Sequence, residues 1–234
     1  MAMALLFDSV VIPEVAVQDS DLRFPVRRIY CVGQNYRDHV KEMGGDPKSS
    51  PPVFFSKPAD AIMPSGSRIA YPSATGNLHY EVELVVALKS GGSELDAHRA
   101  LQCIYGYAVG IDFTRRDLQA EAKQKGRPWD TAKGFDASAP LSPIKQADSG
   151  EPADERIWLE VNGELRQDAK LSDMIWSVPE ILAQLSRYYA LRAGDLVFTG
   201  TPAGVSSVVA GDRIQGGIEG VGEVTVELVS GAPI

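Results

Sequence analysis

The segment His79-Tyr80-Glu81-Val82-Glu83-Leu84-Val85-Val86-Ala87-Leu88 decides the fold expected for this chain. Side chains alternate between the two faces of a β-strand, and apolar residues recur here at every second position, so we predict a strand over 79–88. One face carries Tyr80, Val82, Leu84, Val86 and Leu88. The other face carries Glu81 and Glu83 and then becomes apolar, so two carboxylates share a face that is not uniformly polar.

A third carboxylate, Asp112, ends the apolar segment 104–111, which we predict to be a buried strand. Burying carboxylates is costly unless a cation or hydrogen-bond donors compensate them. In one interpretation Glu81 and Glu83 lie on an edge strand and face water, as charged side chains usually do. In the other, all three carboxylates converge on a hard divalent ion such as Mg²⁺, Mn²⁺ or Ca²⁺, which prefers oxygen ligands. The residue pattern alone leaves both interpretations open.

Composition and charge narrow the class of protein. The chain has 234 residues, enough for one sizeable core, and a formal net charge of −8. This acidic balance argues against nucleic acid as a partner, and no apolar run approaches the roughly 20 residues of a membrane span. Cys31 and Cys103 fit no zinc motif, which indicates a reducing compartment. The N-terminus does not resemble a signal peptide, and we expect a cytoplasmic protein.

The remaining pattern predicts an α+β fold. Strands outnumber helices, hairpins dominate and regular β-α-β alternation is missing, which favours a mostly antiparallel sheet system in one domain over 27–234, after an N-terminal arm over 1–26. Asn162-Gly163 predicts a type I′ hairpin turn, and Ser177 with Glu180 predicts a helix start. The predicted strands are 27–33, 52–58, 79–88, 104–111, 157–161, 164–167, 196–199, 212–214 and 221–229, and the predicted helices are 35–45, 96–102, 114–125 and 178–190.

His39 and Glu42 form a candidate catalytic pair. They are three residues apart on the predicted helix over 35–45, so their side chains are neighbours. A carboxylate beside an imidazole fixes the tautomer of the ring and stabilises its charged form, as a general base requires. The alternative is a solvated surface pair, because Arg37 and Lys41 lie on the same short helix.

Further candidates lie downstream. Arg116 and Gln119 follow Asp112 on one helix face, so they either fix a ligand's carboxylate and hydroxyl beside the metal or form an ordinary helix surface. Lys133, near an aromatic residue and a glycine, is either aimed into a pocket from a loop or solvated. The segment 199–204 either holds an anion with its backbone N–H groups and hydroxyls or is a tight turn. It lacks the lysine and the spacing of a P-loop.

Taken together, these segments resemble the fumarylacetoacetate hydrolase family, most of all its small single-domain branch, which includes the acylpyruvate hydrolases and fumarylpyruvate hydrolase. The matches occur in the family's order over roughly 27–229 and are highly specific together. They are Tyr30-Cys31-Val32-Gly33-Gln34-Asn35-Tyr36 with His39 and Glu42, Phe55-Ser56-Lys57-Pro58, His79-Tyr80-Glu81-Val82-Glu83, Gly110-Ile111-Asp112-Phe113-Thr114-Arg115-Arg116-Asp117, Lys125-Gly126-Arg127-Pro128-Trp129 through Lys133, and Phe198-Thr199-Gly200-Thr201-Pro202. Gln34 departs from the pattern, because many relatives carry Arg or another residue there.

The resemblance implies a mixed β-roll, a homodimer and a bound Mg²⁺ or Mn²⁺ ion. It implies that the metal ligands are Glu81, Glu83 and Asp112. His39 and Glu42 match a dyad on a lid helix that orders over bound ligand, and Lys133 matches the pocket lysine. The residues that match those around the bound oxoacid are Arg116, Gln119 and Thr201.

The implied activity is hydrolysis of the carbon–carbon bond of a 2,4-dioxo acid in aromatic-compound catabolism, for which fumarylpyruvate, cleaved to fumarate and pyruvate, is the first choice. His39, oriented by Glu42, would take a proton from water, and Lys133 would stabilise the developing oxyanion. Oxaloacetate decarboxylation, or isomerisation or hydration of a dienoate, would need the same chelation of an oxoacid but no attack of water on a carbonyl. A third hypothesis is a non-catalytic protein that binds 2-oxo acids.

Overall fold

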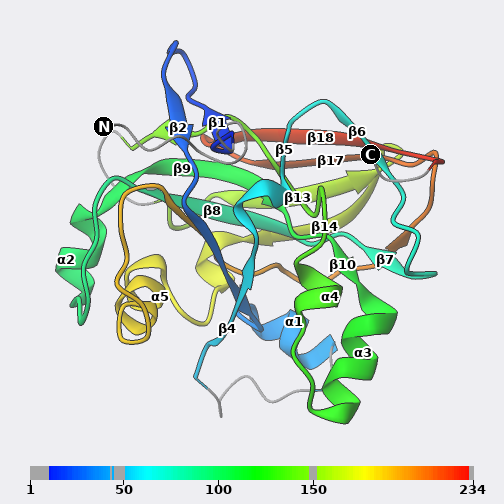
Figure 1. The fold of residues 1–234 in the computed structure, drawn as a ribbon, viewed down its shortest axis with the longest axis horizontal. Helices are drawn as coiled ribbons and strands as arrows, with labels where there is room; N and C mark the ends of the chain where they lie inside the picture. Colours follow the sequence, from blue (N-terminus) through cyan, green and yellow to red (C-terminus); the bar gives the residue numbers. More distant parts are fainter. Residues whose placement is uncertain (1–10, 43, 45–50, 148–151, 232–234) are drawn as a thin grey trace, which may run out of the picture.

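The computed structural model describes residues 11–42, 44, 51–147 and 152–231. Within these residues the strands form four sheets, of eight, five, three and two strands, and the helices are few and short (Figure 1). The α+β prediction is therefore confirmed. None of the described helices is long and apolar enough to cross a membrane.

The eight-stranded sheet runs in the order β4-β3-β15-β8-β9-β11-β5, with β12 paired to β9. Its strands are β3 (Arg28–Gly33), β4 (Val53–Lys57), β5 (Ile62–Pro64), β8 (Val82–Leu88), β9 (Ile104–Ile111), β11 (Ala139–Leu141), β12 (Lys145–Gln146) and β15 (Asp195–Phe198). β8 lies between β9 and β15 and is antiparallel to both. β15 is parallel to β3 and β11 is parallel to β5, so the sheet is mixed. Because β8 is interior, the edge-strand interpretation of Glu81 and Glu83 is wrong.

The five-stranded sheet, in the order β14-β13-β17-β18-β6, packs against β8 and β9. Its strands are β6 (Ser67–Ala70), β13 (Arg156–Val161), β14 (Glu164–Lys170), β17 (Arg213–Ile218) and β18 (Gly222–Val229). The turn between β13 and β14 has φ of +54° at Asn162 and +80° at Gly163, as the predicted type I′ turn requires. The small sheets are β1 (Glu14–Ala16) with β2 (Arg23–Pro25), and β7 (Leu78–His79) between β10 (Thr114–Arg115) and β16 (Ser207–Val208).

The helices lie at the margins of the sheets. They are α1 (Arg37–Glu42), α2 (Ala97–Gln102), α3 (Arg116–Lys125), α4 (Asp130–Lys133) and α5 (Val178–Leu185), with 3₁₀ turns η1 (Ala59–Ala61) and η2 (Leu171–Asp173). α1, α3 and α4 gather at the lower margin in Figure 1, and α2 and α5 contact each other elsewhere. Ser177 and Glu180 form the predicted capping box of α5.

The strand β8 separates two apolar cores, which explains its sequence. Val82, Leu84, Val86 and Leu88 belong to a large core with the five-stranded sheet and α5, whereas Val85 and Ala87 belong to a smaller core with β3 and β15. Both faces of this strand are therefore buried. The face of Val85 and Ala87 is also the face that carries the two glutamates.

Several predictions for single elements differ from the structure, and the helix predicted over 35–45 is observed as α1, with residues 43 and 45 outside the described residues. The strand predicted over 79–88 is broken at Tyr80 and Glu81, because β7 pairs in the three-stranded sheet and β8 in the eight-stranded sheet. α3 starts at Arg116 instead of residue 114, because Thr114 and Arg115 form β10. α5 ends at Leu185 instead of residue 190. Lys133 lies on the short helix α4, not in a loop.

Candidate active site

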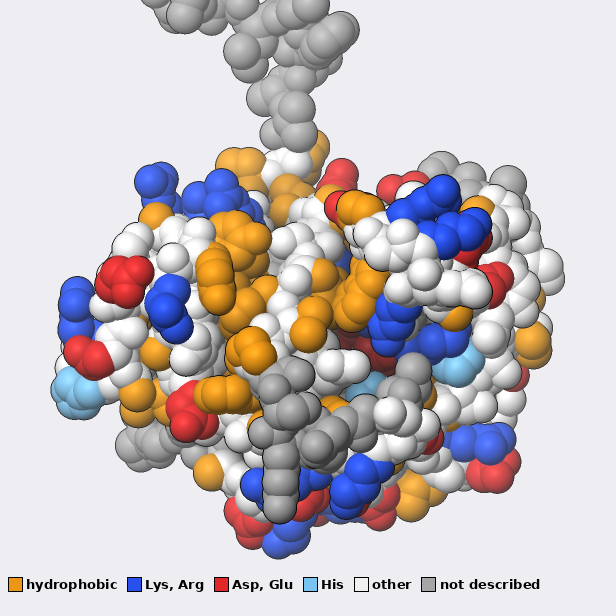
Figure 2. Space-filling model, turned by 90° about the horizontal axis from the view of Figure 1, so that it is seen from below, with side chains coloured by type: hydrophobic (Ala, Val, Ile, Leu, Met, Phe, Trp, Pro, Cys, Tyr) orange, Lys and Arg blue, Asp and Glu red, His pale blue; other side chains and the backbone are white. Residues whose placement is uncertain are grey.

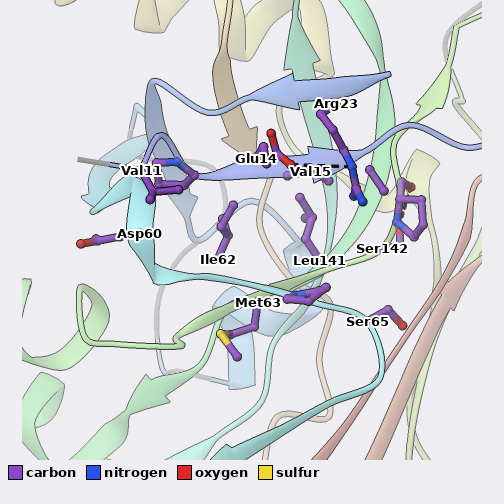
Figure 3. A pocket seen from close by; sticks show the side chains of 14 residues that line it. Val11, Glu14, Val15, Arg23, Asp60, Ile62, Met63, Ser65, Leu141 and Ser142 are labelled. Carbon is purple, nitrogen blue, oxygen red and sulfur yellow. Dashed lines mark hydrogen bonds and ion pairs between the residues drawn. The ribbon is translucent and has the colours of Figure 1, made fainter. Parts of the chain in front are cut away.

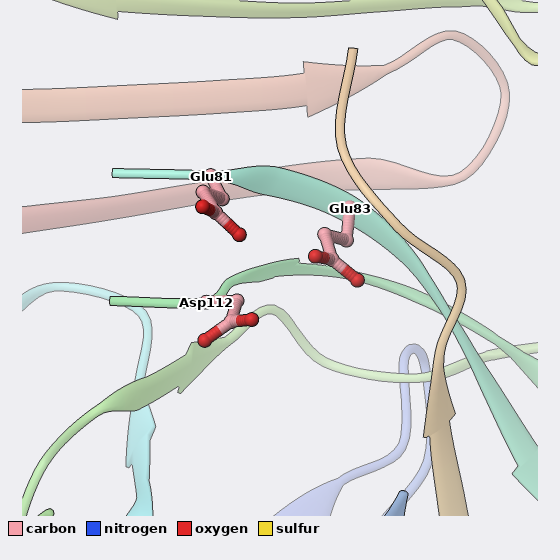
Figure 4. Close-up of side chains that lie close together, drawn as sticks. All are labelled: Glu81, Glu83 and Asp112. Carbon is pink, nitrogen blue, oxygen red and sulfur yellow. The ribbon is translucent and has the colours of Figure 1, made fainter. Parts of the chain in front are cut away.

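The three carboxylates that were anomalous in the sequence lie together where β8 begins and β9 ends. Glu81 immediately precedes β8, Glu83 is its second residue, and Asp112 immediately follows β9. The pairing of Val82 with Ile111, together with the hydrogen bond from the Asp112 N–H to the Glu81 carbonyl (2.8 Å), sets these segments side by side. The carboxylate groups point toward one another, and one oxygen of each lies within 4.8 Å of the others (Figure 4). All three side chains are buried.

Cations surround this acidic triad. Lys133 Nζ donates to Glu81 Oε2 at 2.8 Å and to Asp112 Oδ2 at 2.6 Å, and Arg116 pairs with Glu81 Oε1. Burial alone would raise the pKa of Glu81, but Lys133 and then Arg116 outweigh it and hold that pKa below its usual range. Burial lowers the pKa of Lys133, but Asp112 and Glu81 outweigh it and raise that pKa. Both groups are therefore charged at neutral pH.

The donor set of the triad fits a divalent metal ion. Asp112 Oδ1 lies 2.8 Å from Lys57 Nζ, but not in hydrogen-bonding geometry, and it makes no hydrogen bond to any described residue. Glu83 receives one backbone hydrogen bond, from the Gly200 N–H at 2.7 Å. Burial, followed by the nearby charges of Asp112 and Glu81, raises the pKa of Glu83. A divalent cation would relieve this repulsion and use the Asp112 oxygen that makes no hydrogen bond.

The His39–Glu42 pair is formed on α1, beside the triad. His39 Nδ1 lies 3.3 Å from Glu42 Oε2, and the Gly204 N–H donates to the same oxygen at 3.3 Å. The His39 side chain is 7% exposed, so the interpretation of a solvated surface pair is wrong for the imidazole, whereas the Glu42 side chain is 37% exposed. Burial lowers the pKa of His39, while Glu81 and Glu42 oppose that shift. A neutral imidazole at neutral pH is suited to accept a proton.

Asn35 fixes the start of α1 to the rest of the site. Its Nδ2 donates to the carbonyls of Thr199 (2.7 Å) and Trp176 (3.0 Å), and its Oδ1 accepts the Trp176 N–H (2.8 Å). The side chain is fully buried. One residue therefore holds the dyad helix to the segment that supplies the Gly200 N–H to Glu83.

The residues predicted to surround an oxoacid reach the same place. Arg116 Nη1 donates to Gln119 Oε1 at 2.7 Å, which confirms that they share a face of α3. Thr201 Oγ1 accepts a hydrogen bond from Gln167 Nε2 at 2.9 Å. Arg116, Gln119 and Thr201 line one cavity with His39 and Lys133, so the structure brings all but two of the predicted residues to its wall. The two exceptions are Asp112, which accepts a hydrogen bond from Lys133, and Glu42, which lies beside Nδ1 of His39.

The cavity at the triad is small, about 30 Å³, because Lys133 and Arg116 extend across it. In Figure 2 the corresponding face is hollowed, with acidic and histidine side chains at the bottom, Lys and Arg on one side and apolar side chains on the other. A larger cavity of about 540 Å³ lies between the β1–β2 hairpin, β5 and β11 (Figure 3). It is lined mainly by apolar side chains and by none of the predicted site residues, so its size does not mark it as a catalytic site.

Sequence reasoning missed two lysines. Lys57, at the end of β4, is buried, pairs with Asp112 and also donates to the Phe113 and Lys133 carbonyls. A lysine after the apolar Val53-Phe54-Phe55 was the available signal. Lys123 lines the cavity from α3, and its spacing from Arg116 and Gln119 was the available signal.

Comparison of the sequence with known proteins finds one matching family and several similar relatives. Residues 28–229 match the family described as fumarylacetoacetate (FAA) hydrolase, C-terminal. A fumarylpyruvate hydrolase of Ralstonia sp is 46% identical over 173 residues, covering 74% of this chain and 90% of the relative. The mitochondrial oxaloacetate tautomerase FAHD1 of Rattus norvegicus is 46% identical over 196 residues, covering 83% of this chain and 88% of the relative.

A solved structure extends the comparison to the whole fold. The crystal structure of fumarylpyruvate hydrolase from Pseudomonas aeruginosa in complex with Mn²⁺ and pyruvate superposes with a TM-score of 0.95 and 48% identity. The alignment covers 97% of this chain and 100% of that one. The predicted β-roll fold type is confirmed by this similarity.

Proposed function

The chain belongs to the fumarylacetoacetate hydrolase family, and within it we propose that the protein hydrolyses the carbon–carbon bond of a 2,4-dioxo acid, cleaving fumarylpyruvate to fumarate and pyruvate. The observation that carries the proposal is the buried triad of Glu81, Glu83 and Asp112 beside Lys133 and the His39–Glu42 dyad. The 48% identity to a fumarylpyruvate hydrolase solved with Mn²⁺ and pyruvate supports the choice of substrate class.

Mg²⁺ or Mn²⁺ is the proposed cofactor, held by Glu81, Glu83 and Asp112. Such an ion supplies Lewis acidity and a template for the carboxylate and 2-oxo group of the substrate. Lys133 and Arg116 hold Glu81 in its charged form, and the Gly200 N–H orients Glu83. These contacts keep carboxylate oxygens directed at one point, as ligand-supporting interactions do in metal sites.

The dyad supplies the proposed base. Glu42 engages Nδ1 of His39, which directs Nε2 of the ring to take a proton from water. The resulting hydroxide adds to the 4-carbonyl, and Lys133 donates to the developing oxyanion. The bond between C3 and C4 then breaks, its electron pair stays with the pyruvate part, and C3 takes up a proton. One water is consumed, and fumarate and pyruvate are released.

A second candidate is proton transfer on oxaloacetate. The 46% identity to a relative named oxaloacetate tautomerase favours it, and its chemistry needs a base beside the oxoacid but no attacking water. Decarboxylation of oxaloacetate and dienoate isomerisation or hydration stay predictions of the same kind. The His39–Glu42 dyad is compatible with each of them, so the site geometry alone does not choose between them.

The experiment that tests the proposal uses metal-stripped protein reloaded with Mn²⁺ or Mg²⁺. Fumarylpyruvate, acetylpyruvate and oxaloacetate are supplied separately, and pyruvate, fumarate, acetate and the oxaloacetate tautomers are quantified. We expect one fumarate per pyruvate from fumarylpyruvate. Conversion of oxaloacetate tautomers without cleavage of either acylpyruvate would instead establish the second candidate.

Homodimer formation, a cytoplasmic location, a role in aromatic-compound catabolism and the boundary between an arm over 1–26 and a domain over 27–234 remain proposals. The family match begins at residue 28, which is compatible with that boundary. Sedimentation of the full chain would test the dimer.

A further inference from the structure

One cation that lines the cavity has no part in the mechanism above. Lys123 lies on α3, four residues after Gln119 and seven after Arg116, so these side chains follow one face of the helix. It borders the same cavity as Glu81 and Lys133. The helix that presents Arg116 to the triad therefore also presents a lysine further along the cavity wall.

Lys123 differs from the other cations of the cavity, because no described residue supplies it with an anionic partner. Arg116 pairs with Glu81, and Lys133 pairs with Glu81 and Asp112. Among the described residues, no carboxylate forms an ion pair with Lys123, and no acceptor forms a hydrogen bond with it. Its ammonium lies 5.1 Å from the ring centroid of Trp129, a cation–π contact. Such a contact orients the group while leaving N–H donors available to a ligand.

The charges around Lys123 favour a bound anion. Burial lowers its pKa first, and Arg116 and Lys133 lower it further, while Glu81 acts in the opposite direction. Two cations and one carboxylate thus have the largest electrostatic influence on the Lys123 ammonium, whose side chain is solvent-exposed at the rim of the cavity. A carboxylate brought by a ligand would supply the missing counter-charge and accept a charge-assisted hydrogen bond.

The space beside Lys123 suits an extended acyl chain. Phe55 and Trp129 form an aromatic wall, with ring centroids 5.7 Å apart and planes at 57°. These residues and Lys133 also line an adjoining cavity of about 350 Å³. A flat, conjugated acyl group can lie against such a wall while its oxoacid end remains at the triad.

We propose that Lys123 binds the distal carboxylate of a dicarboxylic substrate whose 2-oxo acid end lies at the triad. The proposal rests on the proposed function for the reaction and deepens it by naming the substrate class. Lys123 is then the residue that makes fumarylpyruvate a better substrate than acetylpyruvate, which has a methyl group in place of the distal arm. Trp129 positions the ammonium.

Arg127 is the competing cation. It lines the adjoining cavity, but its side chain is 64% exposed and lies 3.7 Å from Glu121. A guanidinium that already has a carboxylate nearby gains less from binding a second one than an ammonium to which the described residues supply none. Arg127 therefore serves as the discriminating variant in the test.

The kinetic test compares kcat/KM for fumarylpyruvate and acetylpyruvate in Mn²⁺-loaded full-length protein. Lys123→Met keeps the side-chain stem against Trp129 and removes the charge. We expect the ratio of the two kcat/KM values to fall by about 10- to 100-fold, the loss of one charge-assisted hydrogen bond. Lys123→Arg should retain most of the ratio. Lys125→Met is the matched control, because Lys125 pairs with Glu121 outside the cavity and should leave the ratio unchanged.

A binding test separates this proposal from the proposed reaction. Calorimetry with 2-oxoheptanedioate and 2-oxoheptanoate, which share the chain length of fumarylpyruvate and differ in a terminal carboxylate, requires no turnover. We expect wild-type protein to prefer 2-oxoheptanedioate and Lys123→Met to lose that preference, even if no acylpyruvate is cleaved. The proposal is overturned if both substrates or both ligands weaken equally, if the wild type shows no preference, or if Arg127→Met changes the ratio and Lys123→Met does not.

Discussion

Glu81, Glu83 and Asp112 lie where two interior strands of the eight-stranded sheet begin and end, whereas His39 and Glu42 lie on a six-residue helix at the margin of that sheet. The triad is held by the pairing of β8 with a strand on each side, and its three side chains are buried. A helix as short as α1 has little stability of its own, so the dyad depends on tertiary contacts, mainly those of Asn35 and of Gly204 with Glu42. The proposed metal ligands are therefore built into the fold, and the residues proposed to transfer protons are attached to it. Changes to the two regions should have separable consequences.

The largest expected effect is on the free energy of unfolding, when one negative charge of the triad is removed in metal-free protein. Asp112→Asn removes the charge that faces Lys133 and Lys57 and leaves two buried ammonium groups poorly compensated, so we expect a loss of about 3–5 kcal/mol of unfolding free energy. Glu83→Gln removes a carboxylate that its two neighbours repel, and should leave stability unchanged or raise it. Urea unfolding of the two variants measures the difference. If both variants lost the same unfolding free energy, the result would contradict the inferred repulsion of Glu83 by Asp112 and Glu81.

The next effect concerns the dyad alone. His39→Ala removes the proposed base without touching the sheet, so kcat on acylpyruvates should fall by about 10²–10⁴-fold. Steady-state kinetics at saturating Mn²⁺ measure it. Wild-type kcat in this variant would refute the role assigned to His39.

A smaller effect is expected from removing the Asn35 side chain, which holds α1 to Thr199 and Trp176. Asn35→Ala leaves the Thr199 and Trp176 carbonyls without their side-chain donor, which should cost about 1–3 kcal/mol of stability. Turnover should fall with it, because α1 loses its attachment, while Mn²⁺ affinity is retained. Parallel denaturation, kinetics and metal titration make the comparison. If Mn²⁺ affinity fell as steeply as turnover, the two regions would not be separable.

The smallest effect is a displacement of the pH profile. Because the pKa of His39 is lowered, the neutral base persists below its ordinary value near 6.5, and kcat/KM should decline only at more acidic pH. Glu42→Gln removes an influence that raises this pKa, so the acidic limb should move to still lower pH. If the acidic limb of the pH profile moved to higher pH in Glu42→Gln, the result would contradict the pairing of Glu42 with His39.

The same two regions show what the sequence could and could not predict. The carboxylates could be found because Glu81, Glu83 and Asp112 interrupt apolar runs, and the turn at Asn162-Gly163 because its conformation requires those residues. The break at Tyr80 and Glu81 could not be found, because alternation continues across it while the pairing partners change.

The neighbours of the triad were harder to predict than the triad. Lys57 is distant from Asp112 in sequence and becomes its partner only when β4 pairs with β3. Lys123 carries the helical spacing of Arg116 and Gln119, but only the fold shows that its ammonium lies over the Trp129 ring and that no carboxylate among the described residues pairs with it. The roles of His39, Glu42 and Lys133 came from a family resemblance, since the local pattern alone favoured solvated surface residues.

The most direct test of the central claim is a calorimetric Mn²⁺ titration of metal-stripped wild-type protein, Glu83→Gln and His39→Ala. We predict one bound ion per chain in the wild type, no measurable binding in Glu83→Gln, and wild-type affinity in His39→Ala despite its lost turnover. Undiminished binding in Glu83→Gln, or loss of binding in His39→Ala, would contradict the assignment of the metal to the triad and of proton transfer to α1.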